Sequence, residues 1–174
     1  MTAAAPTWPD DIFRELLAAG VRQVAYVPDS GHARLIEMCH ADPHVRAVTL
    51  TSEEEGVALL AGAWLGGERG ALLMQSSGVG NCVNMLSLTR TCRFPLLILA
   101  TMRGEEGEIN PWQLPMGRIA AAALGLAGVA VHRADEAAKV GAAVAEAARA
   151  AFAGPAAVAV LIAQRVIGVK AFED

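Results

Sequence analysis

The chain has 174 residues, a length typical of one domain. Hydrophobic residues make up 54% of it, which is enough for a full core without disulfides or a structural metal. The net charge is −4 and only 5% of the residues are aromatic. A nucleic-acid partner is therefore not expected, because such a partner requires a basic surface and aromatic stacking platforms.

The cysteines and the apolar stretches indicate the compartment. Cys39, Cys82 and Cys92 form no CxxC or zinc-like spacing, and the odd count is typical of a reducing compartment, so we expect a soluble cytoplasmic protein. The N-terminal residues lack the charged and apolar regions of a signal peptide. The longest uncharged apolar stretches, 119–131 and 150–163, are shorter than the roughly 18 residues of a membrane span.

Helical and strand-like hydrophobic periods alternate along the chain. In chain order, we expect a helix at 12–17, a strand at 23–27, a helix at 33–39, a strand at 45–50, a helix at 53–65, a strand at 71–75, a helix at 81–91, a strand at 95–100, a helix at 116–124, a strand at 129–132, a helix at 136–152 capped by Asp135, and a strand at 156–162. This order predicts a single α/β domain, in which a doubly wound, mostly parallel six-stranded sheet carries helices on both faces.

In such a sheet, ligands bind outside the carboxyl ends of the strands. Four segments directly follow predicted strands and are expected to form the site: 28–32, 51–55, 76–81 and 101–117. The last of them is a loop of about 15 residues, and loops of that length in compact domains are often functional.

Three consecutive glutamates follow Ser52 at the start of a predicted helix. Ser52 and Glu55 have the spacing of a capping box, and acidic side chains are favourable at a helix N-terminus. This explains Glu55 but leaves Glu53, which occupies the first helical position after a strand and is expected to face the crevice. Both a helix-capping and a functional interpretation of Glu53 remain open.

A glycine-rich turn follows the strand that ends near Gln75. Gly78 and Gly80 permit positive φ and a close approach of a ligand to the backbone, although an ordinary turn explains them equally well. A dinucleotide fingerprint would need a third glycine where Val83 stands.

Two further segments have both a structural and a functional interpretation. Asp29 and Ser30 suit a turn or a helix cap as well as a ligand site. Arg103 could pair with an anionic group of a substrate or remain a solvated surface residue.

Taken in order, these segments resemble the pyrimidine-binding (Pyr) domain of thiamine-diphosphate enzymes. Within that family the likeness is greatest to the α subunits of sulfopyruvate decarboxylases and next to phosphonopyruvate decarboxylases. The resemblance covers residues 10–162 and rests on five motifs in register: VPDS (27–30), EEEGVALLAGAWL (53–65), MQSSGVGN (74–81), PLLILATMRG (95–104) and QLPMG (113–117).

The resemblance implies a role for individual residues. Glu53 lies nine residues before Gly62, and a glutamate in that position is catalytic, hydrogen-bonding N1′ of the cofactor's aminopyrimidine ring. The other implied contacts are Ser77, Gly78 and Asn81 beside the cofactor, Ser30 and His32 near the substrate carboxylate, and Arg103 and Gln113 near the anionic end of the substrate. The reaction implied is decarboxylation of a 2-oxo acid, with the thiazolium ring as electron sink.

The resemblance also implies a partner chain. Members of the superfamily hold Mg²⁺ and the diphosphate through Gly-Asp-Gly followed later by Asn, on a PP domain, and no Gly-Asp-Gly occurs here. We therefore expect a separate PP-domain β subunit, a hetero-oligomer, and no metal ligands in this chain, all of which forms one Pyr-type domain (1–174). The expected substrate is a small anionic 2-oxo acid. 3-Sulfopyruvate is the first choice, and phosphonopyruvate or another 2-oxo acid is the alternative. A non-catalytic Pyr-like or flavodoxin-like binding subunit is the alternative of another class.

Overall fold

A computed structural model describes residues 7–168 of the chain. Its elements in order are α1 (Trp8–Ala18), β1 (Val21–Tyr26), η1 (Ser30–His32), α2 (Ala33–Ala41), β2 (Arg46–Thr49), α3 (Glu53–Leu65), β3 (Arg69–Gln75), η2 (Ser76–Gly78), α4 (Val79–Cys82), α5 (Ser87–Thr91), β4 (Leu96–Thr101), η3 (Pro111–Gln113), α6 (Leu114–Leu126), β5 (Ala130–Ala134), α7 (Ala137–Ala153), β6 (Ala157–Ile162) and α8 (Gln164–Ile167), where η marks a 3₁₀ turn.

The six strands form one sheet in the order β2-β1-β3-β4-β6-β5, and every neighbouring pair is parallel. The predicted doubly wound parallel sheet is confirmed. Since β2 and β3 lie on opposite sides of β1, the winding reverses between β1 and β3, and a second reversal lies between β4 and β6. Crevices at such reversals are where sheets of this kind bind ligands.

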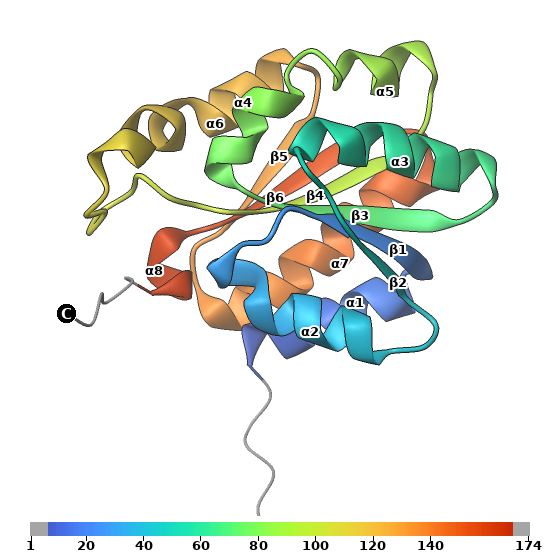
Figure 1. Cartoon of the computed structure of the whole chain (residues 1–174), viewed down its shortest axis with the longest axis horizontal. Coiled ribbons are helices and arrows are strands. Elements are labelled where there is room, and N and C mark those ends of the chain that lie inside the picture. Colours follow the sequence, from blue (N-terminus) through green and yellow to red (C-terminus); the bar gives the residue numbers. More distant parts are fainter. Residues whose placement is uncertain (1–6, 169–174) are drawn as a thin grey trace, which may run out of the picture.

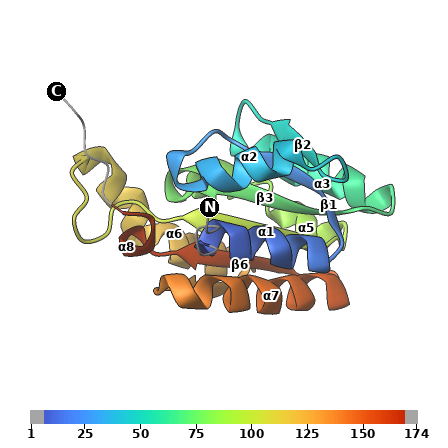
Figure 2. The same ribbon diagram turned by 90° about the horizontal axis from the view of Figure 1, so that it is seen from below.

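Helices cover both faces of the sheet. Helices α3, α4, α5 and α6 lie on one face, while α1, α2 and α7 lie on the other (Figure 1). The view in Figure 2 shows α1 running beside α7, with which it packs. Alternate strand residues point into two separate apolar clusters, and strand β4 is buried along its whole length, as its uninterrupted apolar run predicts.

Helix α3 lies close to the sheet because one residue on its inner side lacks a side chain. A Cβ on Gly56 would lie 2.4 Å from Leu72 Cδ1 and 2.9 Å from Leu50 Cδ1. Glu53 is three residues earlier, so it lies on the same side of the helix, one turn nearer its N-terminus. Ser52 and Glu55 form the predicted capping box at that end.

Two local predictions differ from the structure, and one helix was not predicted. The helix expected at 81–91 is two short helices, because backbone bonds such as Ser87 N to Asn84 O span three residues and tighten the chain between α4 and α5. The N-cap of α7 is Glu136, since the carboxylate of Asp135 pairs with Arg133 instead. Helix α8, after β6, was not predicted.

The helices of residues 7–168 include none that combines the length and the apolar character needed to cross a membrane.

Candidate active site

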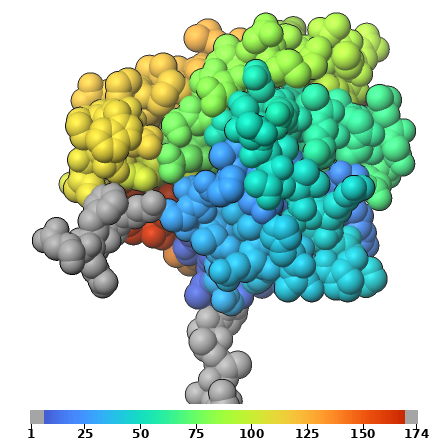
Figure 3. Space-filling view, viewed as in Figure 1, coloured from blue at the N-terminus to red at the C-terminus, as the bar shows by residue number. Residues whose placement is uncertain are grey.

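The predicted site segments meet at the carboxyl edge of the sheet. This edge lies on the left of Figure 1, where the chain leaves β3, β4 and β6. In the space-filling view the yellow segment around η3 and the start of α6 lies against the green segment of η2 and α4, and the teal α3 adjoins the green (Figure 3). Segments far apart in the sequence therefore form one continuous surface here.

Three of the predicted cofactor-binding residues form one cluster. Glu53, the first residue of α3, is largely buried, with 7% of its surface exposed. Asn81, on α4, donates a hydrogen bond from Nδ2 to Glu53 Oε2 over 2.8 Å. Gly78 completes the cluster by lying directly against the glutamate side chain.

Gly78 is required here for space. A Cβ at this residue would lie 2.3 Å from Glu53 Oε1, 2.4 Å from Cδ and 2.5 Å from Cγ. Its φ of −69° is open to any residue, and Gly80 lies within α4, so neither glycine uses the positive φ that it permits. The glycine acts by removing bulk beside a carboxylate.

A cysteine lies near the same carboxylate. Cys82 has no exposed surface. Burial raises the pKa of its thiol to about 12, and the negative charges of Glu53 and Glu54 act in the same direction. The thiol is therefore protonated at neutral pH and is no nucleophile.

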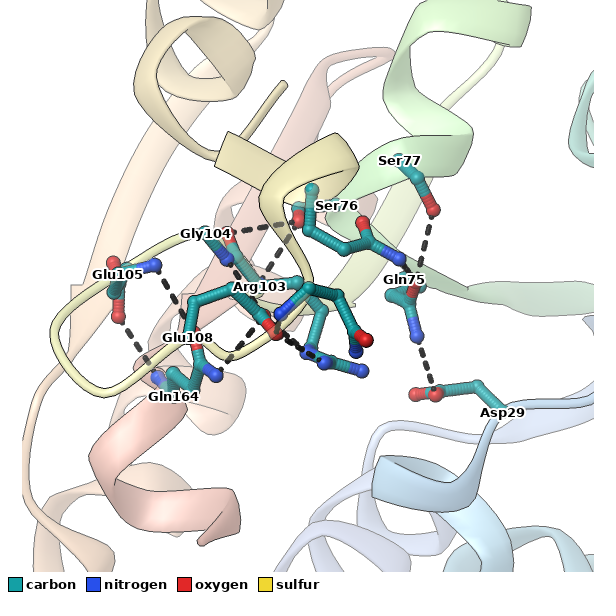
Figure 4. A network of polar contacts seen from close by, with 11 residues as sticks. Asp29, Gln75, Ser76, Ser77, Arg103, Gly104, Glu105, Glu108 and Gln164 are labelled. Atoms are coloured by element: carbon teal, nitrogen blue, oxygen red, sulfur yellow. Dashed lines mark hydrogen bonds and ion pairs between the residues drawn. The ribbon is translucent and has the colours of Figure 1, made fainter. Parts of the chain in front are cut away.

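A second polar cluster joins the ends of three strands (Figure 4). Gln75 donates from Nε2 to Asp29 Oδ1 over 3.0 Å, and Thr101 donates to the other oxygen of the same carboxylate over 2.5 Å. Because an ionised carboxylate only accepts hydrogen bonds, the orientation of the Gln75 amide is fixed. Its Oε1 then accepts from Ser77 Oγ at 3.0 Å and from Gln113 Nε2 at 2.9 Å. We call these five residues the Gln75 network.

Arg103 does not extend into solvent but forms an ion pair within its own loop. Its Nε and Nη2 each donate to Glu108 over 2.7 Å, and the side chains are 11% and 0% exposed. Glu108 also accepts from the backbone N of Gly104 at 3.1 Å, the backbone N of Asn110 at 2.9 Å and Gln164 Nε2 at 3.1 Å. The Arg103 guanidinium is the main reason that the pKa of Glu108 falls to about 2.

Further contacts hold the same loop to the sheet. Glu105 and Gln164 exchange two hydrogen bonds, from Glu105 N to Gln164 Oε1 at 3.0 Å and from Gln164 N to Glu105 Oε2 at 2.8 Å. A Cβ on Gly117 would lie 2.2 Å from the carbonyl oxygen of Arg103, so the start of α6 packs directly on the loop backbone. The long loop predicted from sequence is thus a tightly held structure.

The lowered pKa of Glu108 predicts a pH dependence of stability. Its folded-state pKa lies below the ordinary 4.5, so the ionised form favours folding. That stabilisation is fully present above about pH 4.5 and is lost as the pH falls toward about 2. In urea unfolding, the wild-type chain should be more stable than Glu108→Gln at pH 7, and the difference should narrow steadily from pH 4.5 to pH 3. A difference independent of pH would contradict this assignment.

Ser30 is exposed and lies at the first switch in strand order. With Asp29, Thr101 and Arg103 it lines a small crevice of about 20 Å³.

His32 lies in the interior instead. It is 1% exposed, and its Nε2 lies 3.1 Å from the carbonyl oxygen of Leu99, to which it can donate. Burial lowers the pKa of the imidazole, against the opposing influence of the Asp29 charge. A neutral, enclosed ring offers no surface to a substrate in this conformation, and the predicted contact with the substrate carboxylate stays a prediction.

Sequence reasoning missed several residues that organise this edge. Gln75 and Thr101 lie in the expected site segments or next to them, but neither side chain was given a role, although their position at a carboxyl edge was a usable signal. Glu108 and Gln164 carried no local signal, because their partnership joins residues 56 apart in the chain.

The comparisons with known proteins agree with this geometry. The family model described as "Thiamine pyrophosphate enzyme, N-terminal TPP binding domain" matches residues 7–113, more than half of the chain. The chain belongs to this family. The resemblance to Pyr domains inferred from the five motifs is thereby confirmed.

Curated relatives in this family are decarboxylases. Sulfopyruvate decarboxylase subunit alpha of Methanothermobacter thermautotrophicus is 40% identical over 108 residues, which cover 62% of this chain and 66% of that protein. Phosphonopyruvate decarboxylase of Streptomyces viridochromogenes is 43% identical over 111 residues, covering 63% of this chain and 28% of that protein. The matched region thus spans slightly less than two thirds of the alpha subunit and under a third of the longer enzyme.

A solved structure supports the fold alone. The 2-oxoglutarate:ferredoxin oxidoreductase from Magnetococcus marinus, with 2-oxoglutarate, coenzyme A and succinyl-CoA bound, matches with a TM-score of 0.73 at 13% identity. The match covers 93% of this chain and 29% of that chain.

Proposed function

We propose that this chain is the α (Pyr) subunit of a thiamine-diphosphate-dependent 2-oxo-acid decarboxylase. The observation that carries the proposal is the Glu53 cluster: a buried carboxylate at the carboxyl edge of a parallel sheet, oriented by Asn81 and lying against a glycine. Membership of the thiamine-pyrophosphate enzyme family and the decarboxylases among its relatives support it.

The residues present fit the aminopyrimidine ring of the cofactor. The absence of a Cβ at Gly78 gives the Glu53 carboxylate room to lie at the carboxyl edge, where any larger residue would collide with it. Glu53, Ser77, Gly78 and Asn81 are the residues that would hold the ring. When bound, the cofactor supplies a thiazolium group able to stabilise the negative charge left by loss of carbon dioxide.

The chain's own contribution is to place and hold a proton. Asn81 fixes Glu53 Oε2 through a hydrogen bond of 2.8 Å, so the other oxygen is the one left to share a proton with a ring nitrogen. Burial of Glu53 keeps bulk water from competing for that proton.

A partner chain is part of the proposal. Within residues 7–168, no group of three or more His, Cys, Asp or Glu residues is arranged to hold a metal ion. We assign Mg²⁺ and the diphosphate to a PP-domain β subunit with Gly-Asp-Gly and Asn, in a cytoplasmic hetero-oligomer. The designation of a relative as "subunit alpha" supports a second subunit. Residues 1–174 would then form one Pyr-type domain.

The proposed substrate is 3-sulfopyruvate, converted to sulfoacetaldehyde and carbon dioxide. Sulfopyruvate decarboxylase alpha subunits at 36% and 40% identity support this choice. Phosphonopyruvate is the second candidate, because a phosphonopyruvate decarboxylase is 43% identical over a similar length. We assign Ser30 and Gln113 to the substrate. Ser30 lines the small crevice together with Asp29, and Gln113 bonds Gln75, which in turn bonds Asp29.

The test is reconstitution with the partner. Titration calorimetry should show weak binding of thiamine diphosphate to the isolated chain, and Mg²⁺-dependent binding once a PP-domain chain is added. Release of carbon dioxide from 3-sulfopyruvate, phosphonopyruvate and benzoylformate by the pair then ranks the substrates, and 3-sulfopyruvate should react fastest. Tight Mg²⁺-dependent binding by this chain alone would overturn the shared site, and no release from any acid would overturn the decarboxylase.

A further inference from the structure

The segment of residues 102–113, here called the 102–113 loop, connects β4 to α6 along the proposed active site. The resemblance gives its arginine, Arg103, the task of meeting the anionic end of the substrate. The contacts of that arginine in the structure indicate a different task.

The charge of Arg103 is already matched. Two of its nitrogens donate to the two oxygens of Glu108 at 2.7 Å each, the bidentate geometry that makes such pairs strong. Its side chain is 11% exposed and that of Glu108 is 0% exposed. The two nitrogens that form this fork are already used. An incoming carboxylate or sulfonate could take the same bidentate contact only by displacing a buried carboxylate, which would be left without its counter-charge.

Glu108 in turn holds the loop from three directions. It accepts from the backbone N of Gly104 and Asn110 within the loop, and from Gln164 beyond the end of β6. At the base of the loop, the backbone N of Arg103 donates to Ser76 Oγ at 3.0 Å. Figure 4 shows these contacts as one connected set.

The far end of the loop delivers a residue to the site. Gln113, the last residue of η3, donates to Gln75 Oε1 at 2.9 Å and so joins the Gln75 network. The fixed loop therefore determines where Gln113 lies relative to Ser77 and Asp29.

We propose that Arg103 is a positioning residue that acts through Glu108. It holds the 102–113 loop in place, and thereby Gln113 against the Gln75 network, and it does not bind the anion of the substrate. The effect on turnover rests on the proposed function, whereas the effect on the loop does not.

Hydrogen–deuterium exchange on the full chain tests the loop directly. Arg103→Ala and Glu108→Ala should each raise exchange of residues 104–112 by at least about tenfold, and the double variant should add little, because both remove the same interaction. The matched control is Arg14→Ala, which removes two exposed ion pairs, with Asp11 and Glu15, and should leave the loop unchanged. Unchanged protection in both single variants would overturn the proposal.

Kinetics of the reconstituted pair test the role in turnover. Arg103→Ala and Glu108→Gln should lower kcat/KM by similar factors and in the same direction, because both release the same loop. Arg103→Lys should be impaired as well, since lysine cannot make the bidentate pair. An anion receptor would behave in the opposite way: Glu108→Gln would free Arg103 and lower KM, and lysine would restore binding. That result would overturn the proposal. A wild-type pair without activity would overturn the proposed function alone, and the exchange measurement would still decide whether Arg103 holds the loop.

Discussion

Glu53→Gln is expected to lower decarboxylation by the reconstituted pair by about 10²–10⁴-fold, the usual contribution of a positioned proton-transfer group. Glutamine has nearly the same volume and can still bond Asn81, but it cannot share a proton with a ring nitrogen. The measurement is kcat for the substrate that the wild-type pair uses best, with native mass spectrometry to confirm that the variant still assembles.

The matched control is Glu54→Gln. Glu54 is the next residue along α3 and carries the same charge at the same helix end, but it is exposed. It should retain near-normal turnover, because only the helix dipole interaction changes. Near-normal turnover by Glu53→Gln would remove Glu53 from the chemistry, and equal losses in both variants would point to a general charge effect.

Gly78→Ala is expected to lower kcat about as much as Glu53→Gln does, because it displaces the carboxylate instead of removing it. The new methyl group would fall 2.3–2.5 Å from three atoms of the Glu53 side chain, so the carboxylate must move away from Asn81. Forcing an extra carbon into a packed site typically lowers the free energy of unfolding by about 1–3 kcal/mol. The urea concentration at the midpoint of unfolding should fall accordingly.

Gly80→Ala provides the control within the same turn. A Cβ there would meet only the Sδ and Cε atoms of Met116 at 3.5 Å, an ordinary contact with a flexible side chain. This variant should keep both its stability and its activity. If Gly78→Ala also retained both, the close approach of Glu53 to the glycine would not be needed for function.

Much of the architecture could be predicted from sequence because local patterns determine it. The apolar run at 95–100 predicts a strand covered on both faces, and β4 is buried throughout. Glu53 could be singled out for a similar reason: Ser52 and Glu55 satisfied the helix end, and of the two remaining glutamates Glu53 holds the first helical position after a strand.

The organisation of the substrate side could not be predicted in the same way. In the sequence, Arg103 is only a cation that follows a strand. The fold shows that it forms an ion pair with Glu108. Gln75 and Gln113 join across 38 positions, and Glu108 and Gln164 across 56. Such pairings depend on how strands are ordered in the sheet, a property that hydrophobic periodicity does not encode.

The close contact between Gly56 and Leu72 has a consequence for how such a protein can change. The depth of Glu53 below the surface follows from the distance between α3 and the sheet. That distance is short because Gly56 has no side chain. A bulkier residue at Gly56 would lift the first turn of α3 and withdraw the carboxylate without touching any ligand. Substitutions around Ser30 leave that spacing intact. Under the proposed function, selection could therefore alter which acid is accepted without moving Glu53.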